Sequence, residues 1–172
     1  MLDLNRFVSG VAGIIFDNAS YAGIEADALT PELKARISAI TRSTTLYAKR
    51  ISNTAAEFAD TFNNALLSRL RNTGISQGVN IPQSALNHIG NQIRIAYPAE
   101  NLLDVILDID DTAEYEAFLD NDYENIVNEL ENIEENRQAL EDAQDADPDN
   151  TPAQVVITTY IIIYCFLYTT FL

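Results

Sequence analysis

The chain is poor in several residue types that commonly build functional sites. It has 172 residues, with no tryptophan, one cysteine and one histidine. The lone cysteine, Cys165, excludes an intrachain disulfide, so nothing indicates an oxidising compartment. His88 has neither a second histidine nor a cysteine nearby, and we expect a surface or capping role for it. The N-terminal segment lacks a basic head and a long apolar run, so a classical secretion signal is not expected.

Basic residues are also scarce, and the charge is unevenly distributed. The chain has 10 Lys or Arg against 26 Asp or Glu, a net charge of −16. Residues 100–154 hold nineteen acidic residues and one basic residue, Arg137, whereas seven basic residues lie within residues 34–71. This balance excludes phosphate-dominated nucleic-acid binding and simple attraction to anionic lipid. The acidic block is interpreted as a solvated face or as a surface for a basic partner, either residues 34–71 or another chain.

Helical periodicity dominates the first half of the chain. A long helix is expected over residues 31–73, with Thr30 as its N-cap, Pro31 at its first position and Gly74 just beyond its end. Apolar or small residues recur along it at spacings that alternate between four and three residues. At residues 51–55 a spacing of four follows another spacing of four, and this irregularity is interpreted as a stutter within one helix. It would span about 60 Å at about 1.5 Å per residue, so its length predicts partner helices. The expected helix–helix contacts are Ile37, Ile40, Tyr47, Ile51, Phe58 and Phe62.

Shorter helices are expected over residues 2–16, 82–96 and 98–109, and a second long helix over residues 112–143. Apolar residues recur in this last segment at steps of four and three, while its other faces are almost wholly acidic. Repulsion between like charges destabilises such a helix in isolation, so it needs a partner for its seam. The basic helix at residues 31–73 predicts antiparallel pairing, within the chain or between copies. The seam contacts expected here are Leu119, Ile126, Leu130 and Ile133.

The stretch ILDIDDT at residues 106–112 resembles the first motif of the haloacid-dehalogenase-like phosphohydrolases, an apolar strand followed by Asp-x-Asp-x-Thr. The resemblance implies Asp108 as nucleophile, Asp110 as general acid/base, and magnesium as cofactor. That family also needs a downstream lysine, and none follows Lys49. It needs strands alternating with helices as well, which this chain does not show. The alternative is a helix end followed by an Asp/Thr cap for the next helix.

A second motif lies in DNDYENIVNELE, residues 120–131, which matches several positions of an EF-hand calcium loop. Asn125 stands where the sharp turn of that loop demands glycine. The apolar seam also runs through the stretch without a break, which favours a continuous acidic helix. A calcium-responsive binding module remains a hypothesis, with ligand candidates Asp120, Asp122, Glu124, Asn128 and Glu131.

The C-terminal stretch VVITTYIIIYCFLYTTFL, residues 155–172, has no charge, glycine or proline. As a helix it would be about 27 Å long, near the lower limit for crossing a membrane core of ~30 Å, and a membrane anchor is the preferred interpretation. Its many β-branched and aromatic residues also suit a segment buried in a neighbouring subunit. An unselected read-through end would show the same abrupt change in composition. The helical stripe proposed for helix–helix contact is Tyr160, Tyr164 and Tyr168.

Together these patterns predict an all-α protein, an elongated bundle of coiled-coil-like helices with a C-terminal transmembrane segment. The expected divisions are residues 1–29, 30–143, an acidic linker at 144–154, and the anchor at 155–172. The expected function is that of a non-enzymatic structural or assembly subunit, such as a virion structural or ejection protein. It would oligomerise with copies of itself through helical seams and dock through its tail to a membrane or neighbouring subunit. No cofactor, nucleic acid or small-molecule substrate is expected, and the expected location is a membrane or a large particle.

Overall fold

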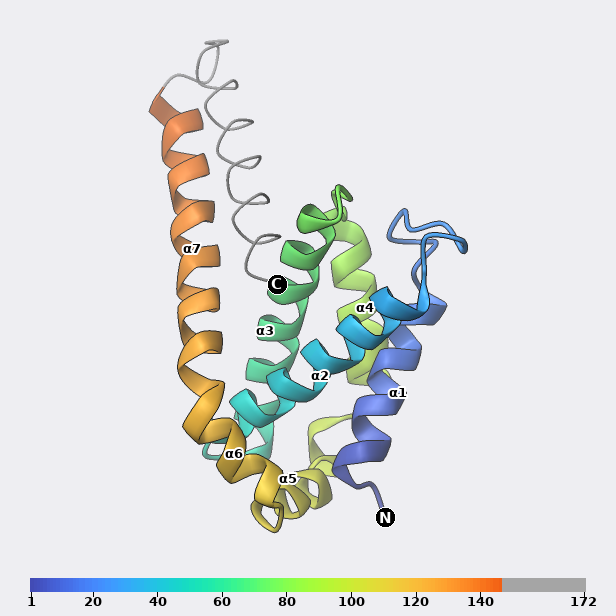
Figure 1. Cartoon of the computed structure of the whole chain (residues 1–172), viewed down its shortest axis with the longest axis vertical. Coiled ribbons are helices and arrows are strands. Elements are labelled where there is room, and N and C mark those ends of the chain that lie inside the picture. The colour runs from blue at the N-terminus through green and yellow to red at the C-terminus, as the bar shows by residue number, and fades with distance from the viewer. Residues whose placement is uncertain (147–172) are drawn as a thin grey trace.

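The structure, a computed structural model, describes residues 1–146, and all of its regular elements are helices. The predicted all-α class is therefore confirmed. In Figure 1, α1 to α4 pack as a bundle, α5 and α6 cross its base, and α7 rises along one side and extends past the other helices. The elements are α1 (Leu4–Asp17), α2 (Pro31–Ile51), α3 (Ala55–Ser76), α4 (Gln83–Ala96), the 3-10 turn η1 (Ala99–Asn101), α5 (Leu103–Asp110), α6 (Ala113–Asn121) and α7 (Tyr123–Ala146).

The expected membrane anchor and its linker lie largely outside the described residues. The apolar segment 155–172, with the stripe Tyr160, Tyr164 and Tyr168, falls wholly beyond residue 146. Within residues 1–146, no helix combines the length and the apolar character needed to cross a membrane.

The apolar face of α1 packs against α2, α4 and α5, and its Phe7 meets aromatic rings of α3. Phe7 is fully buried, with its ring centroid 5.0 Å from that of Phe62 and 6.4 Å from that of Phe58. Tyr97 meets the same ring edge-on at 5.2 Å. Such tilted and edge-to-face pairs stabilise a core beyond the apolar area that they bury. One aromatic cluster therefore joins the N-terminal helix to the middle of the chain.

The prediction of one continuous helix over residues 31–73 is wrong. The chain breaks at residues 52–54, and α2 and α3 fold against one another as a helical hairpin. Thr54 begins the new helix, because its hydroxyl accepts a hydrogen bond from the Glu57 backbone N–H at 3.1 Å. The Glu57 carboxylate in turn accepts one from the Asn53 N–H at 2.9 Å. Thr54 and Glu57 are spaced as in a capping box, so the extra step interpreted as a stutter is a helix start.

The second expected long helix, residues 112–143, is also interrupted. α6 ends at Asn121, the Asp122 N–H donates to the Phe118 carbonyl at 2.8 Å, and α7 begins at Tyr123. Phe118 and Ile126 are both buried on the body, at 3% and 4% exposure. Buried side chains therefore lie on both sides of the break, one in α6 and one in α7.

The end of α3 also differs from the prediction. α3 continues through Gly74 to Ser76, and Gly78 takes the left-handed conformation after it, with φ 78°. Gly74 is needed inside the helix for close packing. A Cβ there would lie 2.8 Å from Ile81 Cδ1 and 2.9 Å from the Val79 carbonyl oxygen, too near for any other residue.

A cavity of about 130 Å³ lies beside Gly74, between α3, α4 and the connector formed by residues 18–29. Ala28 and Gln77, which also line this cavity, are exposed, so it is partly open to solvent.

Candidate functional site

A groove of about 500 Å³ runs between α2 and the α6–α7 segment, with charged residues of both signs along it. Arg36 and Arg42 line it from α2, and Glu114 lines it from α6. Its least exposed charged side chains are Arg69 of α3 and Glu129 of α7, at 8% and 13%. The groove therefore lies where the acidic half of the chain meets the basic half.

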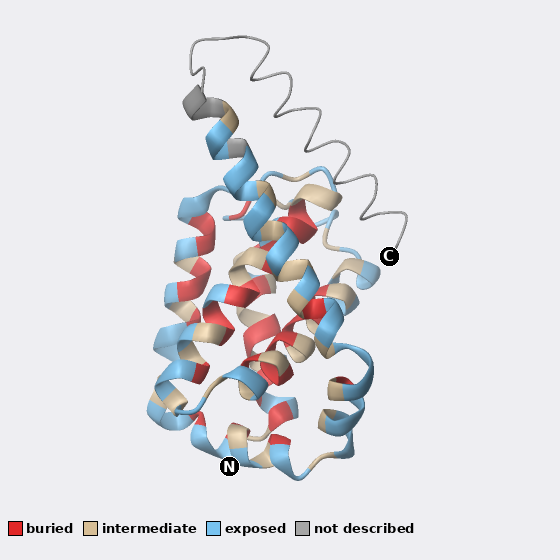
Figure 2. Ribbon diagram, turned by 90° about the vertical axis from the view of Figure 1, so that its left-hand side faces the viewer, coloured by how far each residue is buried: buried red, intermediate tan, exposed pale blue. Residues whose placement is uncertain are grey.

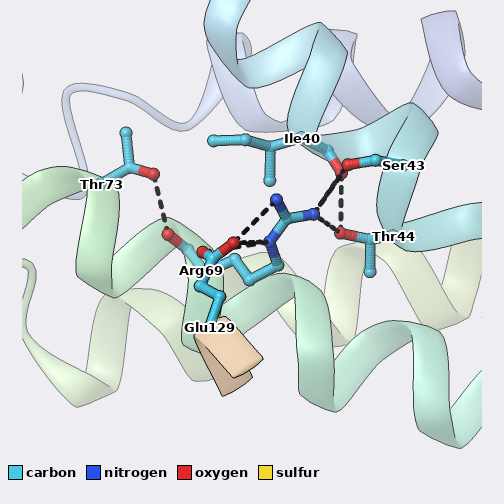
Figure 3. Close-up of polar contacts among 6 residues, drawn as sticks. All are labelled: Ile40, Ser43, Thr44, Arg69, Thr73 and Glu129. Carbon is cyan, nitrogen blue, oxygen red and sulfur yellow. Dashed lines mark hydrogen bonds and ion pairs between the residues drawn. The ribbon is translucent and has the colours of Figure 1, made fainter. Parts of the chain in front are cut away.

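Arg69 joins three helices at this groove, as Figure 3 shows. Its Nε donates to both carboxylate oxygens of Glu129 at 3.2 Å, and Nη2 lies 3.1 Å from Glu129 Oε2. On the other side, Nη1 lies 2.8 Å from the hydroxyl oxygens of Ser43 and Thr44 and 3.3 Å from the Ile40 carbonyl oxygen of α2. A planar guanidinium suits this fork of acceptors in a way that a lysine ammonium would not.

Nearer the base of the bundle, aromatic rings form the contact between α2 and the α6–α7 segment. Tyr47 of α2 stacks on Tyr123 of α7 with centroids 6.1 Å apart, and Phe118 meets Tyr123 edge-on at 6.3 Å. The Arg50 guanidinium lies 6.0 Å from the Tyr123 ring centroid. Burial raises the pKa of the Tyr47 phenol above its ordinary value, and the nearby Tyr123 and Glu131 raise it further. α7 is thus held to α2 and α3 by its first two turns.

Beyond Leu130, α7 leaves the core and becomes mostly exposed (Figure 2). Five acidic side chains are exposed along this part, against one basic side chain. That basic residue, Arg137, pairs with Glu134 and Glu141 on its own helix, and its hydrogen bonds and charge lower the pKa of Glu134. The other exposed acidic residues are Glu131, Glu135 and Asp142.

The residues predicted to form interhelical seams are mostly used inside the chain. Ile37, Ile40, Phe58, Phe62 and Ile126 are buried in its core at 9% exposure or less. The partly buried Tyr47, Leu119 and Leu130 pack against that core, Ile133 is partly buried further along α7, and Ile51 is exposed at 43%. The pairing expected between the basic and acidic segments therefore forms within one chain.

The two aspartates of the phosphohydrolase-like motif lie on a helix rather than after a strand. Asp108 of α5 accepts a hydrogen bond from the Leu4 backbone N–H at 2.9 Å, at the start of α1. Asp110 forms an ion pair with Lys49 of α2 at 3.3 Å. A carboxylate is favourable at a helix N-terminus, and a lysine is favourable near a C-terminus. Both aspartates thus have contacts that fix α5 across the base of the bundle.

The calcium-loop candidates do not form a twelve-residue loop. Asp120 lies at the end of α6 and Asp122 at the break, while Glu124, Asn128 and Glu131 lie along the first turns of α7. A helix points these side chains in different directions, whereas a calcium loop wraps them around one ion. Within residues 1–146, no group of three or more His, Cys, Asp or Glu side chains is arranged to hold a metal ion.

Two polar residues have roles that the sequence did not reveal. The sequence shows Arg69 only as one of the seven basic residues within residues 34–71, although it is the buried centre of the groove. The sequence feature that indicates its burial is its position among the apolar residues of the helix, three residues after Leu66 and one before Leu70. His88 lies 3.1 Å from the Asn18 side-chain oxygen and stacks on Tyr21 with centroids 4.5 Å apart, so it fastens the connector to α4.

Comparison of the chain with models of known protein families, with curated proteins and with solved structures found no match.

Proposed function

We propose that this protein is a non-enzymatic assembly subunit, which presents α7 and the segment after it to other subunits or to a membrane. The observation that carries the proposal is the partial attachment of α7. Its first two turns are fixed on the bundle through Arg69 and Tyr47, while the part beyond Leu130 extends away with an acidic surface. We call the part of α7 beyond Leu130 the arm. Acidic side chains spaced along a lone helix repel one another, so a bound partner would stabilise this arm.

The chemistry of the arm favours a basic protein surface as its partner. Most arginines and lysines of the bundle already have carboxylate or aromatic neighbours, among them Arg42 with Glu114 and Lys49 with Asp110. With a net charge of −16, two copies repel one another at long range. Self-association therefore needs an apolar contribution, and the uncharged residues 155–172 supply it in this proposal, in a neighbouring subunit or in lipid.

The test compares the full chain with a variant ending at residue 154. Light scattering gives the mass of the particle in solution, and flotation with neutral phosphatidylcholine vesicles reports membrane binding. We expect the full chain either to assemble into multiples of its 19.1 kDa mass or to float, and the shortened chain to do neither. A full chain that stays at 19.1 kDa and does not float would refute the proposal.

A charge-matched pair of variants tests the arm separately. Glu131→Lys with Glu135→Lys reverses two exposed acidic residues of α7, and Glu25→Lys with Asp27→Lys reverses two exposed ones of the connector. Both change the net charge equally. With a fluorescent deca-lysine peptide as the basic probe, the α7 variant should lose several-fold more affinity than the connector variant. Equal losses would show that only net charge matters.

A further inference from the structure

The cavity beneath the connector is lined mainly by apolar side chains and is partly open to solvent, because the lining residues Ala28 and Gln77 are exposed. Its lining comes from α1, the connector, α2, α3, the loop before α4, and α4 itself. Apart from Thr73 and Gln77, all of the lining residues are apolar or glycine. The Thr73 hydroxyl is already engaged, because it donates to the Arg69 carbonyl at 2.8 Å. The cavity thus offers mainly apolar contact area and no charged side chain, and its other polar side chain, Gln77, is exposed to solvent.

We propose that this cavity is a binding site for a small, uncharged apolar molecule, such as a monocyclic aromatic hydrocarbon or a branched alkane. Its volume is about 130 Å³. Apolar protein cavities of about 150 Å³ stay dry and take up benzene-sized ligands, because water finds no hydrogen-bond partners there. A ligand of about six to eight carbon atoms fits this volume, whereas a fatty acid or a steroid is too large. Charged metabolites are excluded by the lining.

The connector is suited to act as the cover of this site. Its backbone hydrogen bonds are local, for example from the Ala22 N–H to the Asn18 carbonyl at 3.2 Å and from the Ile24 N–H to the Ala19 carbonyl at 2.9 Å. Gly23 provides the left-handed turn with φ 84°. The described side-chain contacts of Asn18 and Tyr21 with His88 hold it to α4. Ala19 and Ala22 of the connector are also buried, and Ile24 and Leu29 pack against the core. A local opening that separates these contacts would admit a ligand without unfolding the bundle.

The first measurement is the unfolding temperature of the full chain with and without toluene. A ligand that binds only the folded state stabilises it by mass action, so toluene at ten times its Kd should raise Tm by about 4 °C. Benzyl alcohol at the same concentration serves as a polar control. We expect it to give a much smaller shift, because its hydroxyl would lose its hydrogen bonds in the cavity.

A matched pair of variants locates the binding. Ala22→Leu places three extra carbons at a buried lining position, whereas Ala26→Leu adds the same group at an exposed connector position outside the lining. The toluene shift should persist in Ala26→Leu and disappear in Ala22→Leu. Persistence of the shift in Ala22→Leu would place the binding elsewhere and overturn the proposal. Absence of any shift in the unmodified chain would also overturn it.

A second measurement needs no substitution and so stays decisive if Ala22→Leu does not fold. Intermolecular NOEs from the toluene protons should reach the methyl groups of Ile15, Leu86 and Ile89, which line the cavity from α1 and α4. NOEs confined to the exposed Leu103 and Leu107, at 55% each, would show surface adsorption and contradict the proposal.

Discussion

Removing one partner of the Arg69–Glu129 pair should destabilise the fold far more than removing both. In Glu129→Leu the guanidinium of Arg69 stays buried at 8% exposure, with only neutral oxygens on its α2 side. Breaking a buried pair from one side costs about 3–5 kcal/mol, and these neutral acceptors place the expected cost near 3 kcal/mol. In Arg69→Met the carboxylate at 13% exposure is nearer to solvent, and we expect about 2 kcal/mol.

The double variant Arg69→Met with Glu129→Leu replaces both charges by apolar side chains of similar volume. Such replacements in buried ion pairs are often close to neutral. We therefore expect the double variant to lose about 1 kcal/mol, so that the two single losses exceed it by several kcal/mol. The assay is urea unfolding of each full-length variant followed by circular dichroism at 222 nm, with an unchanged m-value as evidence that the same transition is measured.

An exposed pair in the same fold provides the control cycle. Arg94 and Asp60 lie 2.8 Å apart with side chains 46% and 64% exposed, so their coupling should not exceed about 1 kcal/mol. If the Arg69–Glu129 coupling were no larger than that of this surface pair, the assignment of Arg69 as the centre that fixes α7 would be wrong.

Substitutions at four further positions each test a single feature of the fold. Thr54→Ala should cost about 1 kcal/mol by removing the cap of α3, and Thr54→Ser should restore most of it, in the same urea assay. Gly90→Ala should destabilise by about 1–3 kcal/mol, because its Cβ would lie 3.0 Å from Leu67 Cδ1 and 3.1 Å from Asn63 Oδ1. Gly13→Ala, with nothing within 4 Å, should stabilise α1 by up to about 1 kcal/mol, and a loss there would refute the packing of α1. Tyr47 has a pKa raised above 10.0 in the folded state, so its stabilising contribution is complete below pH 10 and is lost as pH rises through the folded-state pKa. Tyr47→Phe should weaken this alkaline loss when Tm is measured from pH 8 to 12, and an unchanged profile would contradict the assignment.

The starts of helices were the most predictable feature, because caps are local. Thr30 accepts a hydrogen bond from the Leu33 N–H at 3.2 Å, and Pro31 occupies the first turn of α2, as the sequence indicated. The break between α2 and α3 carried an equally local signal in Thr54 and Glu57. It was missed because the apolar series continues across it, and periodicity alone cannot distinguish a straight helix from a hairpin that buries the same residues.

The candidate site was less predictable, because it depends on which charges meet after the chain folds. Arg69 and Glu129 are 60 residues apart, and nothing near either residue identifies the other. The same is true of Asp108, whose local context resembles a catalytic motif although its carboxylate caps α1, 104 residues away along the chain. Long-range pairing of this kind follows from the packing of helices, and the local pattern of a single sequence does not reveal which helices will pack together.

The charge asymmetry of the sequence nevertheless has a structural consequence that supports the assembly proposal. Ion pairs from Arg42 to Glu114, from Lys49 to Asp110 and from Arg69 to Glu129 join the basic half to the acidic half. Beyond Leu130, Arg137 pairs with Glu134 and Glu141 on α7 itself, whereas the exposed Glu131, Glu135 and Asp142 form no ion pair with α2 or α3 among those described. A partner with a basic surface would supply the counter-charges for α7 that Arg69 supplies for Glu129.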